Sequence, residues 1–582
     1  MLTPQDRASR AVNTSLDPNA PDAEIVKAVY EWFRTARAAR SPMVNTWNRC
    51  YRALRGQQPA SVEDWRPNVR VPEIFHLARA SVGWKLDQRI VTDISPAAPL
   101  GSDWHSFLNG RCRDLEAVME STHAVNHEEM EYERMLWDAD QFGTGILKTT
   151  WDPTLAGGLG DGLIQRVNPY CLYPDPAASN ERAADYMIEA RIMSLQELDR
   201  RFPGKGDLFV NGAHSEALDE PPSQLHAPSS TIPRVHPNAV SPGTSALWST
   251  SSKSSPLRSS DPIAVLECWV REHTVTRTGK VIDGWRVIIV AGNHLLFNEK
   301  ATDLWSHGGH PYDRYVPHDL GEFWGIGLVE LLGPIQGALN RILRSVQQNV
   351  ELTGNPILSE DAGATTQGAL LAPNRPGSRM TKRQGKEVKW LEPPRLHPNI
   401  TELMAFLLDR MKVVSGLNDL TTGSAPSRTA SDSIASATEA QFISIRSQLI
   451  NLEHTLTSAY TKKAALISEN YTEQRIISIT GPDGTDTPKM LGPNHFMRPS
   501  DEGAVPLEYQ IRVDAGSASH TSRKVREDKA ITLFTLKAID NMTLLESLDW
   551  PNPENVMRRL GLQEASVLAA DQPGARQRAR AS

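Results

Sequence analysis

The amino-acid sequence predicts an α+β fold that is mainly helical and divided into several domains. At 582 residues the chain can bury two to four cores, and its composition, 39% hydrophobic and 23% charged, is ordinary for a folded protein. Residues 324–471 contain three helical patterns separated by loops, and the last pattern runs through residues 431–470 without Gly or Pro. Strand-like segments over 143–202 and 262–300 supply the β part.

Composition and charge exclude several classes of protein. A net charge of −7 excludes a generic DNA-coating protein, which would be markedly basic. The four cysteines lie far apart in the chain, which excludes a local zinc knuckle or a CxxC redox motif and favours buried, reduced thiols. No apolar run is long enough to span a membrane, and the N-terminus lacks the apolar core of a secretory signal. We therefore expect no membrane partner and synthesis in the cytosol.

The N-terminal region is predicted to be helical after a mobile arm. Residues 1–22 are polar and contain proline, whereas 23–40, 49–55, 73–94 and 103–142 carry helical patterns. Large aromatic residues occur throughout this region, and their spacing favours a packed core over a ligand platform. They are Trp32, Phe33, Trp47, Trp65, Trp84, Trp104 and Trp137.

From residue 143 onward the pattern changes to strands and turns. Strands are predicted over 143–151 and 163–167, joined by the turn-rich segment 152–162. Gly158, Gly160 and Gly162 indicate a hairpin turn here, because no helix follows to complete a phosphate site. Residues 203–261 are rich in Ser, Pro, His and Asn and are predicted to be a disordered insertion.

Catalytic and metal-binding motifs are not found. Neither Gly204-Lys205 nor Gly279-Lys280 has the flanking residues of a nucleotide-binding P-loop, and HExxH and GxSxG do not occur. His123 and His127 lie four residues apart, but the neighbouring Glu128 and Glu129 favour a solvated, charged helix face over a metal site. We therefore expect no enzymatic activity, cofactor or metal.

The first helix of the 324–471 region is predicted over 326–352. Six apolar residues recur at alternating intervals of four and three, which places them on one side of the helix, although Pro334 implies a start near Gly333 or a kink. They are Leu328, Leu332, Ile335, Leu339, Ile342 and Val346. A basic loop follows within 353–398, either simply solvated or able to dock an acidic partner or nucleic acid. Its cations are Arg375, Arg379, Lys382, Arg383, Lys386 and Lys389.

A second helix, over 399–416, begins with a capping box formed by Asn399 and Glu402. Its apolar residues are expected to form a broad buried face, and they are Ile400, Leu403, Met404, Leu407, Leu408 and Met411. Residues 417–430 are small and polar, so they predict an adaptable loop held between this helix and the long helix over 431–471. At 1.5 Å per residue that helix spans on the order of 60 Å and needs neighbours along its length.

This order of segments resembles the portal protein of tailed bacteriophages. Supporting matches are Gly143-Thr-Gly145 before Leu147-Lys148, the segment from Asn168-Pro169 to Asp175-Pro176, Phe323-Trp324-Gly325-Ile326-Gly327, and Gly516-Ser517. The similarity covers about residues 25–570 without the 203–262 insertion.

The resemblance implies a ring, commonly of twelve subunits, at one capsid vertex of the virion. It implies a wing over 23–325, 431–471 and 472–515. Two stem helices would follow over 326–352 and 399–416, with a clip between them over 353–398. A tunnel loop would lie over 417–430, and a crown with a basic tail over 516–582. Its implied partners are other copies of the chain, double-stranded DNA bound without sequence preference, terminase, the major capsid or scaffold protein and tail adaptors.

The resemblance also implies roles for individual residues. Those of the tunnel loop that would face DNA are Asn418, Thr421, Thr422, Ser424, Ser427 and Arg428, and Arg341 and Arg344 would line the channel. The basic residues of 353–398 would dock terminase or adaptors. A channel that lets DNA slide should hold few cations, which agrees with the acidic chain.

Two other functions are alternatives to a portal ring. One is another oligomeric scaffold or adaptor that binds an acidic partner, and the least favoured is a hydrolase with a dispersed site.

Overall fold

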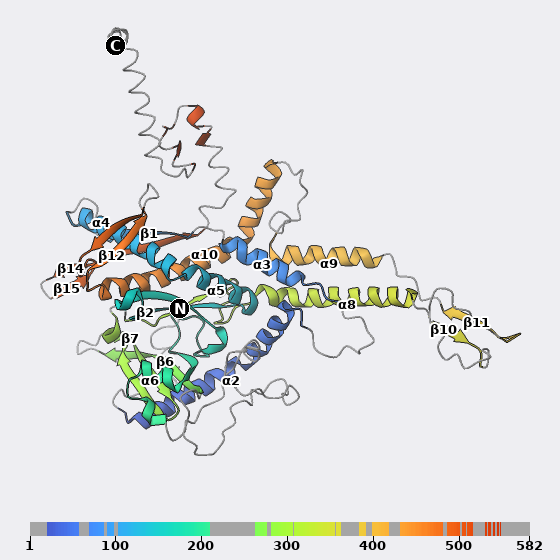
Figure 1. Cartoon of the computed structure of the whole chain (residues 1–582), viewed down its shortest axis with the longest axis horizontal. Coiled ribbons are helices and arrows are strands. Elements are labelled where there is room, and N and C mark those ends of the chain that lie inside the picture. Colours follow the sequence, from blue (N-terminus) through green and yellow to red (C-terminus); the bar gives the residue numbers. More distant parts are fainter. Residues whose placement is uncertain are drawn as a thin grey trace, which may run out of the picture.

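The computed structural model describes most of the chain between residues 20 and 548. The described ranges are 20–57, 69–86, 90–97, 103–209, 262–275, 281–305, 308–354, 357–362, 383–391, 399–417, 431–480, 486–500, 503–507 and 509–515, with single residues between 530 and 548. Figure 1 shows a body of helices and sheets from which two helices, α8 (Leu328–Gly354) and α9 (Asn399–Ser415), extend side by side as a rod.

The N-terminal helices differ in their boundaries from the prediction. The sequence predicts two helices over 23–40 and 49–55, but α2 (Asp22–Leu54) is continuous and contains Pro42. Because Trp32, Phe33 and Trp47 are all buried, packing against the body stabilises both halves of the helix across the proline.

The next two predicted helices, in contrast, are interrupted or end earlier than predicted. The predicted 73–94 helix ends early, since α3 (Glu73–Leu86) is followed by the strand β1 (Ile90–Pro96). The predicted 103–142 helix is divided into α4 (Asp103–Val125) and α5 (Glu128–Phe142). His127 lies between them in the left-handed conformation, with φ of 53°, and this interrupts the helical hydrogen bonding.

Two antiparallel sheets form the body. The smaller has the strand order β3-β2-β9 and consists of β2 (Gly145–Asp152), β3 (Asp161–Val167) and β9 (Tyr312–Tyr315). The larger has the order β4-β5-β6-β7-β8 and consists of β4 (Leu172–Pro174), β5 (Tyr186–Ser194), β6 (Pro262–Val275), β7 (Val281–Ala291) and β8 (His294–Lys300). Apolar residues of α2 pack on this larger sheet in one core, with Val29 and Phe33 beside Ile188 and Ile288.

Short helical segments connect the strands. They are η1 (Ala156–Gly158), η2 (Pro169–Cys171), α6 (Leu195–Arg201), η3 (Gly206–Phe209) and α7 (Ala301–Leu304).

The start of the predicted disordered insertion, residues 203–209, is ordered and contains η3. Phe209 is fully buried against Leu198 and Ile263, which explains this order, and the prediction for 210–261 lies outside the described residues.

The long helix α10 (Ser431–Asn470) closes the small sheet. Its side chains pack in one core with those of α5 and of the sheet. It also satisfies backbone carbonyls on and just after β9: Asn451 donates to Val316, Thr455 to Arg314 and Lys462 to Tyr312, all at 2.9 Å. Side chains of α10 thus occupy an edge that a neighbouring strand would otherwise pair with.

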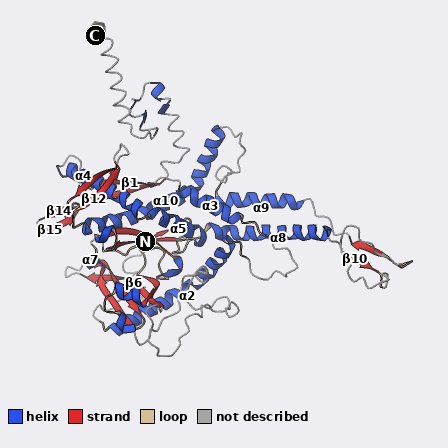
Figure 2. Ribbon diagram, in the orientation of Figure 1, coloured by secondary structure: helices blue, strands red, loops and turns tan. Residues whose placement is uncertain are grey.

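Four further strand pairs complete the described fold. β1 pairs with β16 (Tyr509–Ala515), β12 (Arg475–Thr480) with β13 (Asp486–Leu491), β14 (Met497–Ser500) with β15 (Gly503–Pro506), and β10 (Ile357–Glu360) with β11 (Val388–Leu391). Figure 2 shows β10 at the far end of the rod and the three C-terminal pairs on the body. The mixture of helices and antiparallel sheets confirms the predicted α+β class. The crown and basic tail that the resemblance implies over 516–582 lie largely outside the described residues.

Candidate functional site: the two-helix rod and its root

The apolar side of α8 is buried most deeply where the rod joins the body. Leu328, Leu332 and Leu339 are each at most 6% exposed, and they share a core with Met411 of α9 and Leu77 of α3. Farther along the predicted stripe, Ile342 and Val346 are only half-buried. The first part of α8 is therefore fixed in the body, and the rest projects from it (Figure 1).

Pro334 neither starts α8 nor prevents it from forming. The helix begins at Leu328, where Glu330 and Leu331 donate to the carbonyl of Gly327 at 3.1 and 3.3 Å. Pro334 lies inside the helix and lacks the N–H that would donate to the Glu330 carbonyl. Of the two alternatives that Pro334 left open, a helix start near Gly333 is therefore wrong, because the apolar stripe already packs from Leu328 onward.

The predicted broad buried face of α9 is only partly buried in the single chain. Met411 is the one member of the predicted set that is fully buried, whereas Leu403 is 46% exposed. Phe406 and Val413, which the prediction did not include, are 54% and 59% exposed. Phe406 follows Leu403 by three residues and Val413 follows Phe406 by seven, so these exposed side chains lie on one stripe, turned away from α8. We call Leu403, Phe406, Val413 and Val414 the α9 stripe.

Two Gly-x-Gly segments pack backbone to backbone at the root of α8. Gly143 has φ of +87°, and a Cβ there would overlap the carbonyl of Gly325. A Cβ on Gly327 would lie 2.7 Å from the carbonyl oxygen of Asp140, and the Gly325 N–H donates to Thr144 Oγ1 at 3.1 Å. Because Gly143, Gly325 and Gly327 carry no side chains, the backbone at the end of α5 lies directly against the backbone at the start of α8. We call this contact the glycine joint.

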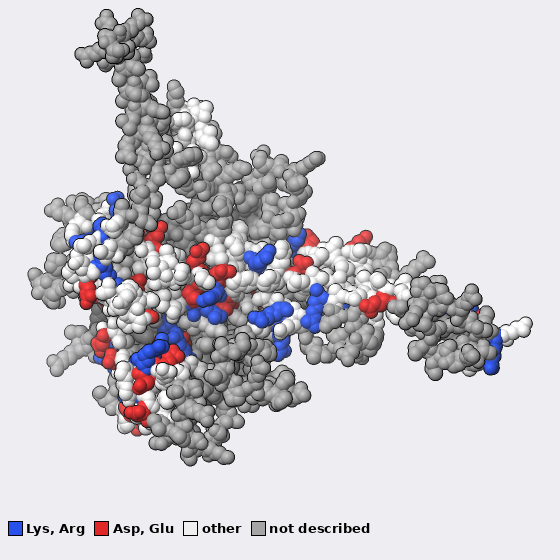
Figure 3. Space-filling view, in the orientation of Figure 1, with Lys and Arg blue, Asp and Glu red and all other residues white. Residues whose placement is uncertain are grey.

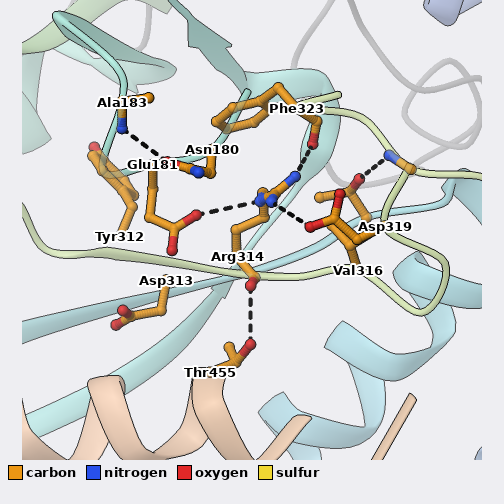
Figure 4. A network of polar contacts seen from close by, with 12 residues as sticks. Asn180, Glu181, Ala183, Tyr312, Asp313, Arg314, Val316, Asp319, Phe323 and Thr455 are labelled. Atoms are coloured by element: carbon orange, nitrogen blue, oxygen red, sulfur yellow. Dashed lines mark hydrogen bonds and ion pairs between the residues drawn. The ribbon is translucent and has the colours of Figure 1, made fainter. Parts of the chain in front are cut away.

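Arg314 of β9 fixes the segment that leads into the glycine joint (Figure 4). Its guanidinium donates to the carbonyls of Glu322 at 2.9 Å and Phe323 at 2.7 Å, and it pairs with Glu181 and Asp319 at 3.2 Å. A polar cavity of about 280 Å³ lies beside it, between this segment and α10. Together with the hydrogen bond from Thr455 of α10 to the Arg314 carbonyl, these bonds connect α10, β9 and the approach to α8 in one continuous structure.

A buried ion pair contradicts the expectation that Glu128 lies on a solvated helix face. Glu128 and Lys463 of α10 are both 0% exposed, and Lys463 Nζ lies 2.7 Å from Glu128 Oε1. The backbone N–H of Ile164 also donates to this carboxylate, at 3.2 Å. Burial by itself would raise the pKa of Glu128, but the contacts with His123 and Lys463 outweigh burial and lower it. The position of Lys463 among Ala464, Leu466 and Ile467 was the available sequence signal for a buried charge.

A second buried charge cluster joins the two sheets. Lys148 of β2 pairs with Glu189 of β5 at 2.7 Å and with Glu267 of β6 at 2.6 Å, and Tyr312 Oη donates to Glu189 at 2.9 Å. Burial would raise the pKa of Glu189, but the charges of Lys148 and Arg191 outweigh it and hold the pKa well below its usual value. The carboxylate is therefore ionised and fixes the sheets to each other.

The structure places some of the predicted site residues. Arg341 is exposed and Arg344 half-buried on α8. Near the tip, Arg383 and Lys389 are exposed and Lys386 is half-buried, and Lys389 pairs with Glu387 at 2.5 Å. Arg375, Arg379 and Lys382 lie outside the described residues. So do all six predicted tunnel-loop residues, Asn418, Thr421, Thr422, Ser424, Ser427 and Arg428.

The C-terminal part of the chain is similar to a known family. Residues 358–582 match the family model of the phage P22-like portal protein. This match begins in β10 and includes α9 and α10, and it confirms the resemblance to phage portal proteins. No curated protein matches the chain. Portal proteins are structural components of the virion. Among the described residues, no helix combines the length and apolar character needed to cross a membrane.

Proposed function

We propose that this chain is the subunit of a portal ring at a unique capsid vertex, forming the channel through which DNA is packaged and ejected. The observation that carries the proposal is the rod, in which α9 is apolar on two sides while the single chain covers one of them. A helix that is apolar on two sides needs a second neighbour. In a ring, the adjacent copy supplies that neighbour, and α9 lies within the part of the chain that matches the portal family.

In this proposal each part of the fold has a role in the ring. α8 and α9 are the stem, the residues between them are the clip, and 417–430 is the tunnel loop at the channel. The two sheets, α2 and α10 form the wing, and residues 516–582 form the crown. The ring contains about twelve copies and acts without catalysis. Terminase and tail adaptors dock on the clip, capsid or scaffold protein surrounds the ring, and DNA passes through the centre without sequence-specific contacts.

Charge on the clip gives this docking role a direct test. Reversing the charge of Arg379, Lys382 and Arg383 should weaken binding of terminase or adaptor measured with the purified components, because an acidic partner surface would then be repelled. Unchanged binding would assign these residues to a merely solvated loop.

Electron microscopy of the purified protein tests the ring itself. We expect closed rings with a central hole, and monomers or open filaments under several buffer conditions would refute the proposal. A variant carrying Phe406→Glu and Val413→Glu should dissociate into smaller species, as measured by light scattering, because it places charge on the α9 stripe. Ala405→Glu is the matched control, since Ala405 is exposed on α9 outside the stripe and its substitution should leave the rings intact.

A further inference from the structure

A histidine and three charged side chains connect α4 to the segment between β13 and β14. His495 lies in this segment, residues 492–496. In the described part of the chain, the charged groups that face it are Arg111 and Asp114 of α4 and Lys489 of β13. Figure 3 shows several Lys and Arg side chains on this end of the body, which carries α4 and the C-terminal strand pairs. We call these four residues the His495 latch.

The contacts of His495 fix which ring nitrogen carries the proton. Arg111 Nη1 donates to His495 Nδ1, and because a guanidinium group can only donate hydrogen bonds, Nδ1 is the acceptor. His495 Nε2 lies 2.8 Å from Asp114 Oδ2, which accepts the Nε2 proton, and Asp114 Oδ1 pairs with Lys489. His495 is therefore neutral in this arrangement, with its one proton on the side of Asp114.

A separate set of contacts holds the same segment in the core of the body. The N–H of Asn494 donates at 3.1 Å to the carbonyl of Tyr471, the residue that follows α10. Phe496 is fully buried, in the core that also contains Tyr471 and Leu115 of α4. The segment can therefore lose its polar bonds to α4 without losing its place in the core.

We propose that the His495 latch is a pH-sensitive switch, which breaks the polar contact between α4 and this segment when His495 takes up a proton. A proton on Nδ1 removes the acceptor that Arg111 uses and puts a second donor in its place. It also adds a third cation around the single carboxylate of Asp114, in a site where the His495 side chain is only 14% exposed. The inference goes beyond the proposed function and does not depend on ring formation.

The latch should be closed at neutral pH. Burial, together with the charges of Arg111 and Lys489, lowers the pKa of His495 below its ordinary value of 6.5, in spite of the bond to Asp114. Because this pKa is lowered in the folded chain, the stabilising contact is present above pH 6.5 and is lost as the pH falls through the lowered value.

Asp114 stays ionised over the range in which His495 titrates. Burial by itself would raise the pKa of Asp114, but the hydrogen bonds from Lys489 and His495 outweigh burial and lower it below its ordinary value of 3.8. A change between neutral and mildly acidic pH therefore reports on the histidine and not on the carboxylate.

Hydrogen exchange of the full chain, measured by mass spectrometry at about pH 7 and about pH 5, tests the switch. After correction for the intrinsic pH dependence of exchange, amides of residues 491–497 should exchange several-fold faster at the acidic pH. His495→Gln keeps an acceptor for Arg111 and a donor for Asp114 but cannot titrate. Its exchange at neutral pH should therefore stay slow, and the acidic increase should disappear.

Two further variants identify the cause of the acidic increase. His76→Gln removes a half-buried histidine of α3 and is the matched control, so it should leave the increase unchanged. Arg111→Met removes the cation that a protonated His495 would repel, so acidification should no longer loosen the segment.

An acidic increase of equal size in His495→Gln and in the unsubstituted chain would overturn the inference. So would exchange that is the same at both pH values in the unsubstituted chain, or an increase that persists in Arg111→Met. The measurement applies equally to rings and to unassembled chains. Failure of the chain to form rings would therefore refute the proposed function and leave the His495 latch to be decided by exchange alone.

Discussion

Substitution of Gly143 by Ala should loosen the root of the rod. Gly143 has φ of +87°, and the added Cβ would overlap the backbone carbonyl of Gly325, which cannot move aside as a flexible side chain could. The left-handed backbone costs an Ala about 1–2 kcal/mol, and forcing an extra methyl group into a packed site costs about 1–3 kcal/mol more. We therefore expect a loss on the order of 3 kcal/mol.

Gly157→Ala is the matched control for this prediction. Gly157 has φ of +71°, but no atom lies within 4 Å of its added Cβ, so its substitution carries only the backbone cost. The difference between the two variants, about 2 kcal/mol, isolates the contact with Gly325 and corresponds to about 4–8 °C in the melting temperature of a domain of 150–250 residues.

Thermal unfolding and hydrogen exchange measure the two consequences. Gly143→Ala should melt below Gly157→Ala, and amides in the first turns of α8 should exchange faster in Gly143→Ala alone. Equal melting temperatures, or faster exchange spread evenly over the body, would show that the glycine joint does not fix α8.

Three further predictions concern the buried charges and the tunnel loop. Lys463→Met should lower the free energy of unfolding by about 3–5 kcal/mol in denaturant titrations because it leaves Glu128 buried without its partner, and adding Glu128→Gln should recover most of the loss. Glu189 has a folded-state pKa below its ordinary value of 4.5, so its contribution to stability is present above pH 4.5 and is lost as the pH falls through the lowered value. Glu189→Gln should therefore flatten the acid side of a plot of melting temperature against pH, and an unchanged plot would contradict this. Deleting 419–428 should leave rings intact in electron micrographs but impair DNA packaging or retention, and an unfolded product would contradict the tunnel assignment.

The sequence predicted the elements that carry a long periodic pattern. The stripe from Leu328 to Val346 and the uninterrupted run over 431–470 correspond to α8 and α10, because helical periodicity depends only on which residues lie on one side. Breaks within helices were less predictable. The sequence predicted a break between residues 40 and 49 that packing overrides, and it did not predict the break at His127, which a left-handed backbone creates.

The charged core was missed because local sequence does not show which charges will meet. Glu128 stands in a run of acidic residues and its partner Lys463 is 335 positions away, so the local pattern indicated a solvated surface. For α9 the pattern predicted an apolar helix but not which side the chain itself would cover. Which charge pairs with Glu128 is decided by the tertiary structure, and the neighbour of the α9 stripe would be decided by the proposed ring.

The glycine joint shows how two weak local signals can combine into one strong structural constraint. Gly143-Thr-Gly145 and Gly325-Ile-Gly327 contributed separately to the resemblance, yet each segment fills the space that side chains on the other would occupy. Arg314 holds the approach to the second segment, and Thr455 of α10 donates to the Arg314 carbonyl at 2.9 Å. α10 follows the proposed tunnel loop and α8 leads to the proposed clip. A displacement of α10 would therefore reach the start of α8 through β9 and the backbone contacts of the glycine joint.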